Sequence, residues 1–149
     1  MTIIEKALYE HGVKERAGSK DNQRILQYFN DLGYHGSQLH DETAWCSAFV
    51  NWVAKQSGYE YSGSLVARSW LQIGTSIVKP KPGDIVVFWR ESPSSWKGHV
   101  AFFIKETKGY VYVLGGNQNN RVCIKAYPKN RVLDYRRLGT ATSKTRGIN

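Results

Sequence analysis

The hydrophobic positions in the first half of the chain recur with the period of an α-helix. The clearest case lies between residues 45 and 58, where one helix face collects the apolar side chains Trp45, Ala48, Phe49, Trp52 and Val53. Thr43 is the expected N-cap of this helix, and Gly58 is its expected stop. Shorter helical patterns cover residues 3–11, 22–32 and 64–74.

The second half of the chain has the pattern of β-strands separated by turns. After the turn at residues 79–84, five apolar or alternating segments predict strands: 84–89, 99–105, 110–116, 121–128 and 131–137. Helices followed by strands predict an α+β fold in which N-terminal helices pack on an antiparallel sheet of about five strands. We expect residues 1–149 to form a single domain, with 139–149 as a flexible basic tail.

Composition and charge narrow the classes of function. The 149 residues are 41% hydrophobic, which permits a core, but no apolar run is long enough to span a membrane, and the N-terminus does not read as a secretory signal. The net charge is +9, and residues 121–149 hold eight Lys or Arg against a single acid. Such a surface favours anionic partners (nucleic acid, anionic lipid or wall polymer), although a solvated basic face would look the same.

Cys46 is the first candidate for chemistry. It lies near the third position of the predicted helix, where unpaired backbone N–H groups and the helix dipole favour a thiolate. A thiolate is nucleophilic, and the same N–H groups could stabilise an oxyanion. The alternative is a small buried side chain that only fills space. Two cysteines exclude a disulfide scaffold, although one bridge from Cys46 to Cys123 stays possible.

His99 is the candidate base, because it opens an apolar strand at the expected rim of the sheet. The other histidines, His11, His35 and His40, read as ordinary surface residues without the spacing of a zinc site. Pairing 99–105 with 110–116 brings Asn117 within reach of His99 if the two glycines before it bulge the strand. An amide oxygen there could orient the imidazole; Gln118 and Asn119 compete for that role, and a simple Gly/Asn turn is the alternative.

Several short motifs occur in an order typical of one family: WCSAFVNW, ARSWL, GDIVVFWR, GHVAFF and LGGNQNN. In this the chain resembles the CHAP and NlpC/P60 branch of the papain-like cysteine peptidases, and within it a group with a GGNQ motif. The resemblance implies that Cys46 is the nucleophile, His99 the base and Asn117 the orienting residue of a peptidoglycan hydrolase that cleaves an amide of the peptide stem without metal or cofactor. Trp45 stands where NlpC/P60 members commonly have Asp.

The resemblance also suggests a cleft and a setting for the enzyme. Trp45, Trp89, Arg90, Trp96 and Gln118 are the expected substrate-binding residues, with core packing as the alternative for the aromatic ones. We expect a monomer that acts on bacterial peptidoglycan, as a phage lysin or as a secreted antibacterial effector with a cognate immunity protein. The sequence has no recognisable nucleic-acid motif, and we expect neither a nucleic-acid partner nor insertion into a membrane. An acyltransferase, a protein deamidase or a non-catalytic basic binding module are the competing functions.

Overall fold

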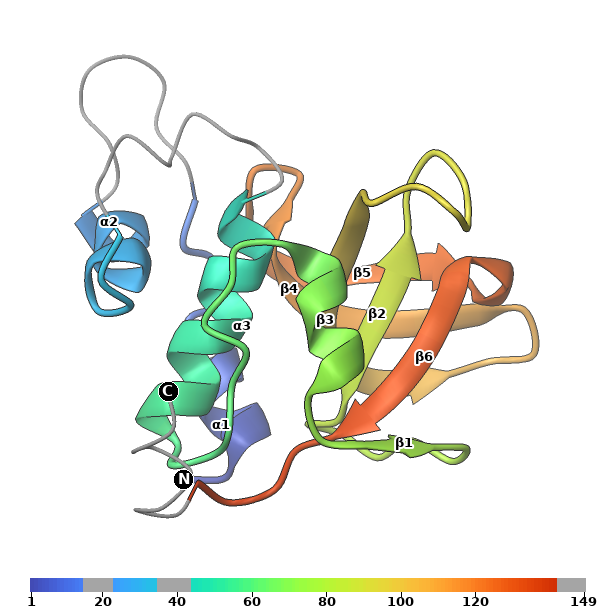
Figure 1. Ribbon diagram of the computed structural model, residues 1–149, viewed down its shortest axis with the longest axis horizontal. Helices are drawn as coiled ribbons and strands as arrows, with labels where there is room; N and C mark the ends of the chain where they lie inside the picture. The colour runs from blue at the N-terminus through green and yellow to red at the C-terminus, as the bar shows by residue number, and fades with distance from the viewer. Residues whose placement is uncertain (15–22, 35–43, 142–149) are drawn as a thin grey trace.

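The computed structural model describes residues 1–14, 23–34 and 44–141. The helical elements along this part of the chain are α1 (Ile3–Leu8), α2 (Gln23–Asn30), α3 (Ala44–Gln56) and the 3-10 helices η2 (Ala67–Gln72) and η3 (Lys129–Arg131). The helices α1, α2 and α3 gather on one side of the molecule and the sheet on the other (Figure 1). Within the described ranges, no helix has both the length and the apolar character that a membrane crossing requires.

A six-stranded antiparallel sheet forms the second layer. Its strands are β1 (Thr75–Ile77), β2 (Ile85–Trp89), β3 (Gly98–Glu106), β4 (Tyr110–Gln118), β5 (Arg121–Pro128) and β6 (Val132–Arg137), in the spatial order β1-β6-β2-β3-β4-β5. The α+β prediction is therefore confirmed, with one strand more than expected. The additional strand β1 pairs Thr75 with Arg137, and its three residues are too few to show a hydrophobic period.

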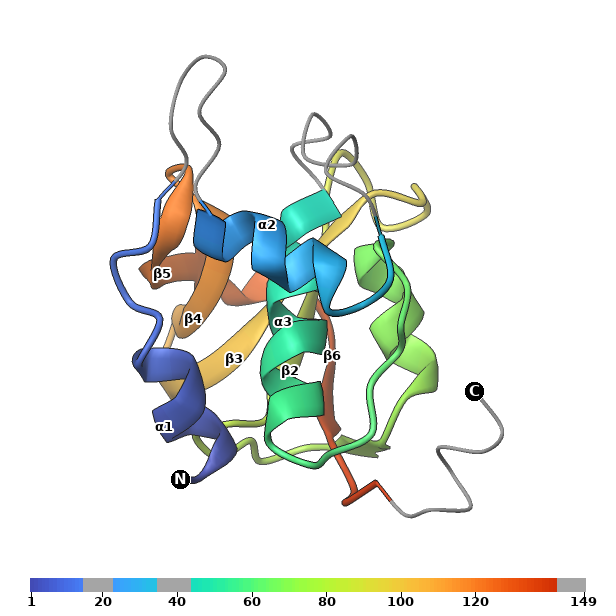
Figure 2. The same cartoon turned by 90° about the vertical axis from the view of Figure 1, so that its left-hand side faces the viewer.

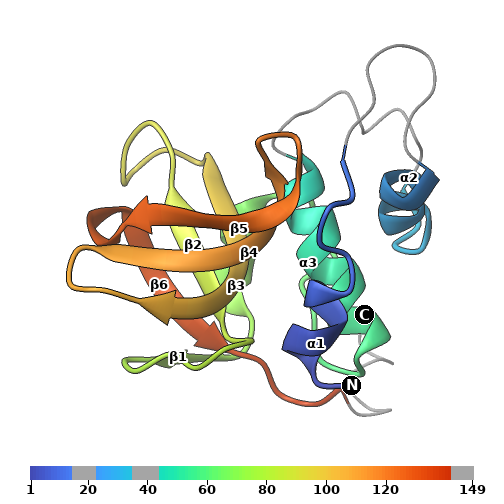
Figure 3. The same ribbon diagram turned by 180° about the vertical axis from the view of Figure 1, so that it is seen from behind.

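The sheet is strongly curled, so that strands that are not neighbours in the sheet face each other across its concave side (Figures 1 and 3). On the face toward the helices, β2, β3 and β4 contribute apolar side chains such as Val87, Phe102 and Leu114 to the main core. The opposite face has its own apolar cluster, in which Phe88 of β2 and Tyr127 of β5 lie with ring centroids 4.7 Å apart. The curl thus brings β5 over β2, although two strands separate them in the sheet.

Helix α3 is the central element of the helical layer (Figure 2). Its apolar face packs on the sheet, where the Phe49 and Phe102 rings lie 6.1 Å apart, and on α2, where Phe49 and Tyr28 lie 5.4 Å apart. The helix ends as predicted before Gly58, whose φ of 79° suits a residue without a Cβ. Thr43, the expected N-cap, lies outside the described residues.

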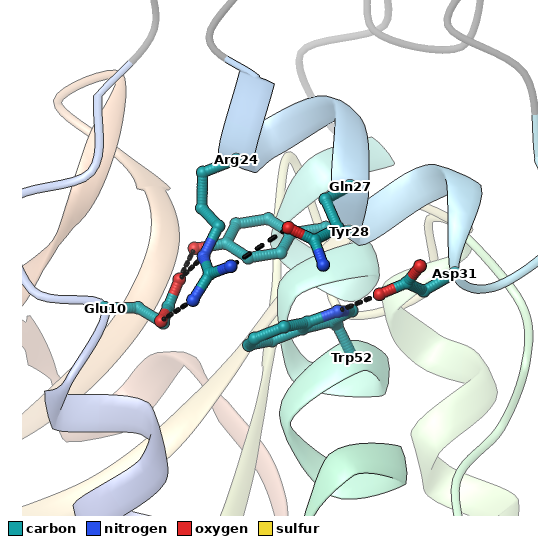
Figure 4. Close-up of polar contacts among 6 residues, drawn as sticks. All are labelled: Glu10, Arg24, Gln27, Tyr28, Asp31 and Trp52. Atoms are coloured by element: carbon teal, nitrogen blue, oxygen red, sulfur yellow. Dashed lines mark hydrogen bonds and ion pairs between the residues drawn. The ribbon is translucent and has the colours of Figure 1, made fainter.

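A buried polar cluster fastens α2 onto its neighbours (Figure 4). The carboxylate of Glu10, only 2% exposed, accepts hydrogen bonds from Arg24 at 2.7 and 3.0 Å and from the Tyr28 hydroxyl at 2.7 Å. The indole N–H of Trp52 in α3 donates to Asp31 at 2.7 Å, and the Arg24 guanidinium lies 4.9 Å from the Trp52 ring. Each polar group that the cluster buries therefore has a partner.

We expect Glu10→Ala to lower the free energy of unfolding by about 3 kcal/mol, because it leaves Arg24 and the buried Tyr28 hydroxyl without their acceptor. Denaturant unfolding followed by circular dichroism measures this loss. The matched control is Glu106→Ala, which removes the half-exposed ion pair with Lys129 and should cost less than about 1 kcal/mol. Equal losses in the two variants would contradict the structural role of the cluster.

Candidate active site

Cys46 occupies the third position of α3, as the helical pattern predicts. Its side chain is 1% exposed, and its sulfur forms no disulfide with Cys123 of β5. The first turn of a helix leaves backbone N–H groups unpaired by the helix itself, so their dipoles favour negative charge at this sulfur. The N-terminal end of α3 lies beside the end of β4 and its turn into β5 (Figures 1 and 3).

Two glycines of β4 allow this close approach of helix and sheet. A Cβ on Gly116 would lie 2.9 Å from both the Cβ of Phe49 and the ring of Trp45 in α3. A Cβ on Gly115 would lie 2.7 Å from Oε1 of Gln118 and 2.8 Å from the Cβ of Ala101. Because real Cβ atoms do not approach other atoms so closely, both positions need glycine.

His99 is held in place by a hydrogen bond from its ring to Gln118. The distance between His99 Nε2 and Gln118 Oε1 is 2.9 Å, and both side chains are buried. The Gln118 amide nitrogen donates to the backbone carbonyl of Cys123 at 2.6 Å, so its oxygen must face the imidazole. That oxygen only accepts, so His99 carries its proton on Nε2 and keeps a lone pair on Nδ1.

The residue bonded to His99 in the structure is Gln118, one of the competitors of Asn117 for the orienting role. Strict alternation would put Asn117 on the same face as Gly115 and His99. Instead the register between β4 and β5 shifts between Gly115 and Gln118, and Asn117 adopts a φ of 57°. The bulge adds one residue to β4 and turns the next side chain, Gln118, toward the histidine. The expected use of Nδ1 for this bond is also replaced by Nε2.

Tyr127 of β5 packs against His99 and Phe88. Its ring centroid is 5.3 Å from that of His99 and 4.7 Å from that of Phe88. Burial raises the pKa of Tyr127, and the charge of Arg90 opposes this rise only in part. The phenol therefore stays protonated and forms an aromatic floor with Phe88.

A hollow of about 240 Å³ opens beside His99 at the rim of the sheet. The Phe88 and Tyr127 rings line it, together with Asn117 of β4 and with Asn119 and Asn120 of the turn between β4 and β5. Three cations complete its lining: Arg90, Lys125 and Arg131. None of the lining side chains is acidic, so the hollow is positively charged.

The pKa of His99 responds to this environment. Burial is the main reason that the pKa falls from 6.5 to about 4. The hydrogen bond to Gln118 opposes the fall in pKa, whereas the three cations of the hollow add to it. At neutral pH the imidazole is therefore uncharged and able to accept a proton through Nδ1.

The structure separates the expected cleft residues into different environments. Trp45 is fully buried against Gly116, so it is a core residue and not a cleft wall. Arg90 lines the hollow, Trp89 lies under the Arg131 guanidinium at 5.3 Å, and Trp96 is 63% exposed but does not line the hollow. Among the described residues, no group of three His, Cys, Asp or Glu could hold a metal ion.

The residues of the site that were not predicted from the sequence include Tyr127, Lys125 and Arg131. All three follow β4 in the chain and reach His99 only because the sheet curls. The concentration of Lys and Arg after residue 120 was the one sequence signal for them, and it did not indicate which cations face the site.

Comparison with known proteins identifies a family. Residues 38–117 match the family model described as the CHAP domain. The matched range contains Cys46, His99 and the β4 glycines, and it ends one residue before Gln118. No curated protein matches the chain.

The pKa of His99 generates a prediction about acid stability. The unfolded chain binds the imidazole proton near pH 6.5 and the folded protein only near pH 4, so stability falls as the pH drops through this window. The expected loss from this group is up to about 3 kcal/mol. Denaturant titrations at pH 7 and pH 4.5 measure it.

His99→Gln should lose less stability over this pH range than the wild-type protein, because glutamine does not titrate. His11→Gln, at an exposed position, should respond to acid as the wild-type protein does. If His99→Gln and the wild-type protein lose equal stability, the histidine titrates normally and its environment is not as described.

Proposed function

Since the chain belongs to the CHAP-domain family, we propose that it is a cysteine-dependent amidase or endopeptidase that cleaves an amide of the peptide stem of bacterial peptidoglycan. Members of this family are in general amidases or peptidases that act on peptidoglycan. The observation that carries the proposal is the His99–Gln118 pair, which leaves Nδ1 of a neutral imidazole able to accept a proton.

In the proposed reaction, Cys46 attacks the carbonyl carbon of the stem amide while His99 takes up the thiol proton on Nδ1. Backbone N–H groups in the first turn of α3 stabilise the oxyanion. His99 then gives the proton to the leaving amine, and the acyl group stays on the sulfur. A water that loses its proton to His99 attacks the thioester and releases the acid, which restores the thiol.

Gln118 is a positioning residue in this scheme and Asn117 is not. The Gln118 amide oxygen holds the Nε2–H tautomer of His99 and stabilises the imidazolium that forms when the thiol loses its proton.

Cys46 is almost completely buried in the free protein, so the atoms that cover the sulfur must shift to admit a substrate. We place the enzyme's action at the bacterial wall, as a phage lysin or a secreted antibacterial effector; in the second case an immunity protein would protect the producer.

The proposal is tested with purified sacculi. The wild-type protein should release soluble wall fragments, and Cys46→Ala should reduce the rate at least about a thousandfold because it removes the nucleophile. Cys123→Ser is the matched control for the second thiol and should keep most of the activity. Mass spectrometry of the fragments identifies the amide that is cut. Equal release by the wild-type protein and Cys46→Ala would refute the catalytic assignment.

The role of Gln118 is tested separately. Gln118→Ala should lower kcat at least about tenfold with a smaller effect on KM, because the imidazole loses its acceptor. Gln118→Glu restores an acceptor, and its negative charge should raise the pKa of His99 and move the acid limb of the pH–rate profile to higher pH. Asn117→Gly, which suits the positive φ, should lower kcat much less than Gln118→Ala. A larger loss of kcat in Asn117→Gly than in Gln118→Ala would show that Asn117, and not Gln118, positions His99.

A further inference from the structure

The hollow beside His99 has an excess of positive charge without a matching acid. Arg90 follows β2, Lys125 lies on β5 and Arg131 ends η3, and all three charges act on the imidazole. Three cations from separate elements thus converge on a space of about 240 Å³. Like charges brought together repel one another, so this arrangement costs free energy in the empty site.

Most donor capacity of these cations is unused. The Arg131 Nη2 donates to the Trp89 carbonyl at 3.0 Å, but its Nε is buried without an acceptor anywhere in the described part of the chain. The Arg90 guanidinium has no hydrogen bond or ion pair with a described residue, and the Lys125 ammonium only faces the Tyr127 ring at 5.4 Å.

Arginines elsewhere in the protein are in a different state. Arg137 pairs with Asp84 through two hydrogen bonds, at 3.0 and 2.8 Å. Arg136 donates to Asp134 and to two backbone carbonyls, and Arg68 donates to three carbonyls of the loop that precedes β3. Arg68, Arg136 and Arg137 thus have acceptors that the Arg90 guanidinium lacks among the described residues.

We infer that the hollow is a subsite for a free carboxylate of the stem peptide, carried close to the amide that Cys46 attacks. Guanidinium groups bind carboxylates through paired charge-assisted hydrogen bonds, and the three asparagines of the rim add neutral donors. The volume suits a carboxylate and a few carbon atoms and is below the usual range for larger ligands. This inference rests on the proposed function and specifies which substrates it accepts.

A bound carboxylate would also change the base beside it. The three cations disfavour the imidazolium form of His99, and a negative charge between them cancels part of that effect. The imidazolium that forms during attack on the amide would then be more stable in the complex than in the free enzyme. Binding of the correct substrate thus promotes proton transfer from Cys46 to His99.

The experiment uses stem peptides in which one carboxylate at a time is converted to its carboxamide, a neutral group of the same shape. For the wild-type protein, kcat/KM should fall at least tenfold for one member of the set. Arg90→Gln and Lys125→Gln should each lower kcat/KM for the free carboxylate several-fold more than for that carboxamide, so that the preference for the carboxylate shrinks. Arg131→Lys, which keeps the charge, should retain more of the preference than Arg131→Gln.

Lys105→Gln is the matched control for Lys125→Gln. The Lys105 ammonium also lies over a tyrosine ring, that of Tyr112 at 4.8 Å, but it does not line the hollow. This variant should treat every peptide of the set as the wild-type protein does. Equal kcat/KM of the wild-type protein for all peptides, or an equal loss on all peptides in the Arg90 and Lys125 variants, would overturn the inference.

Binding to Cys46→Ala, measured by calorimetry, separates this inference from the proposed hydrolysis. If the wild-type protein cuts no peptide but Cys46→Ala binds the carboxylate and not its carboxamide, the subsite stands and the hydrolase does not. If the wild-type protein cuts all peptides equally, the hydrolase stands and the subsite does not. Binding of a single-stranded oligonucleotide that Arg90→Gln abolishes, without any preference among the peptides, would assign the hollow to phosphate and overturn the inference.

Discussion

Close contact between the first turns of α3 and the glycines of β4 is the constraint on which the site depends. Gly116 faces the helix, where Trp45 and Phe49 leave no space for a Cβ, and Gly115 faces the opposite side of the sheet, where Gln118 and Ala101 leave none. At these two adjacent positions β4 therefore has no side chain on either face. This lets the first turns of α3 pack against the strand at Gly116 and lets the Gln118 side chain pack against it at Gly115.

The polar groups of the site orient one another through a chain of hydrogen bonds that leads from β5 to His99. The Cys123 carbonyl determines which way the Gln118 amide points, and the amide determines which nitrogen of His99 carries the proton. Burial among Phe88 and Tyr127 then keeps the imidazole neutral. A base prepared in this way needs little rearrangement before proton transfer, which is how preorganised sites lower barriers.

The sequence predicted the parts of the fold that have a long enough hydrophobic period. The helix with Cys46 and the strands around His99 were found, because each presents a continuous apolar face. The short strand β1 was not, since its three residues show no period. Asn117 was preferred to Gln118 because a bulge was expected at the two glycines and the family resemblance implied an asparagine. In the structure the register shifts between Gly115 and Gln118, and Gln118 bonds to His99. Arg131 and Tyr127 could not be assigned to the site, because their approach depends on the curl of the whole sheet.

The direction of β3 separates the two ends of the sheet by function. His99 is the second residue of β3 and Glu106 is its last. At the rise of an extended strand, the two residues lie roughly 23 Å apart. The connection at 107–109 has open space around Gly109, whereas Gln118 and Arg121 close a two-residue connection directly over the histidine. A wall-targeting module or a label grafted at the distant connection would leave the reacting groups undisturbed. The same graft between β4 and β5 would disrupt the hydrogen bonds that Gln118 forms with His99 and Cys123.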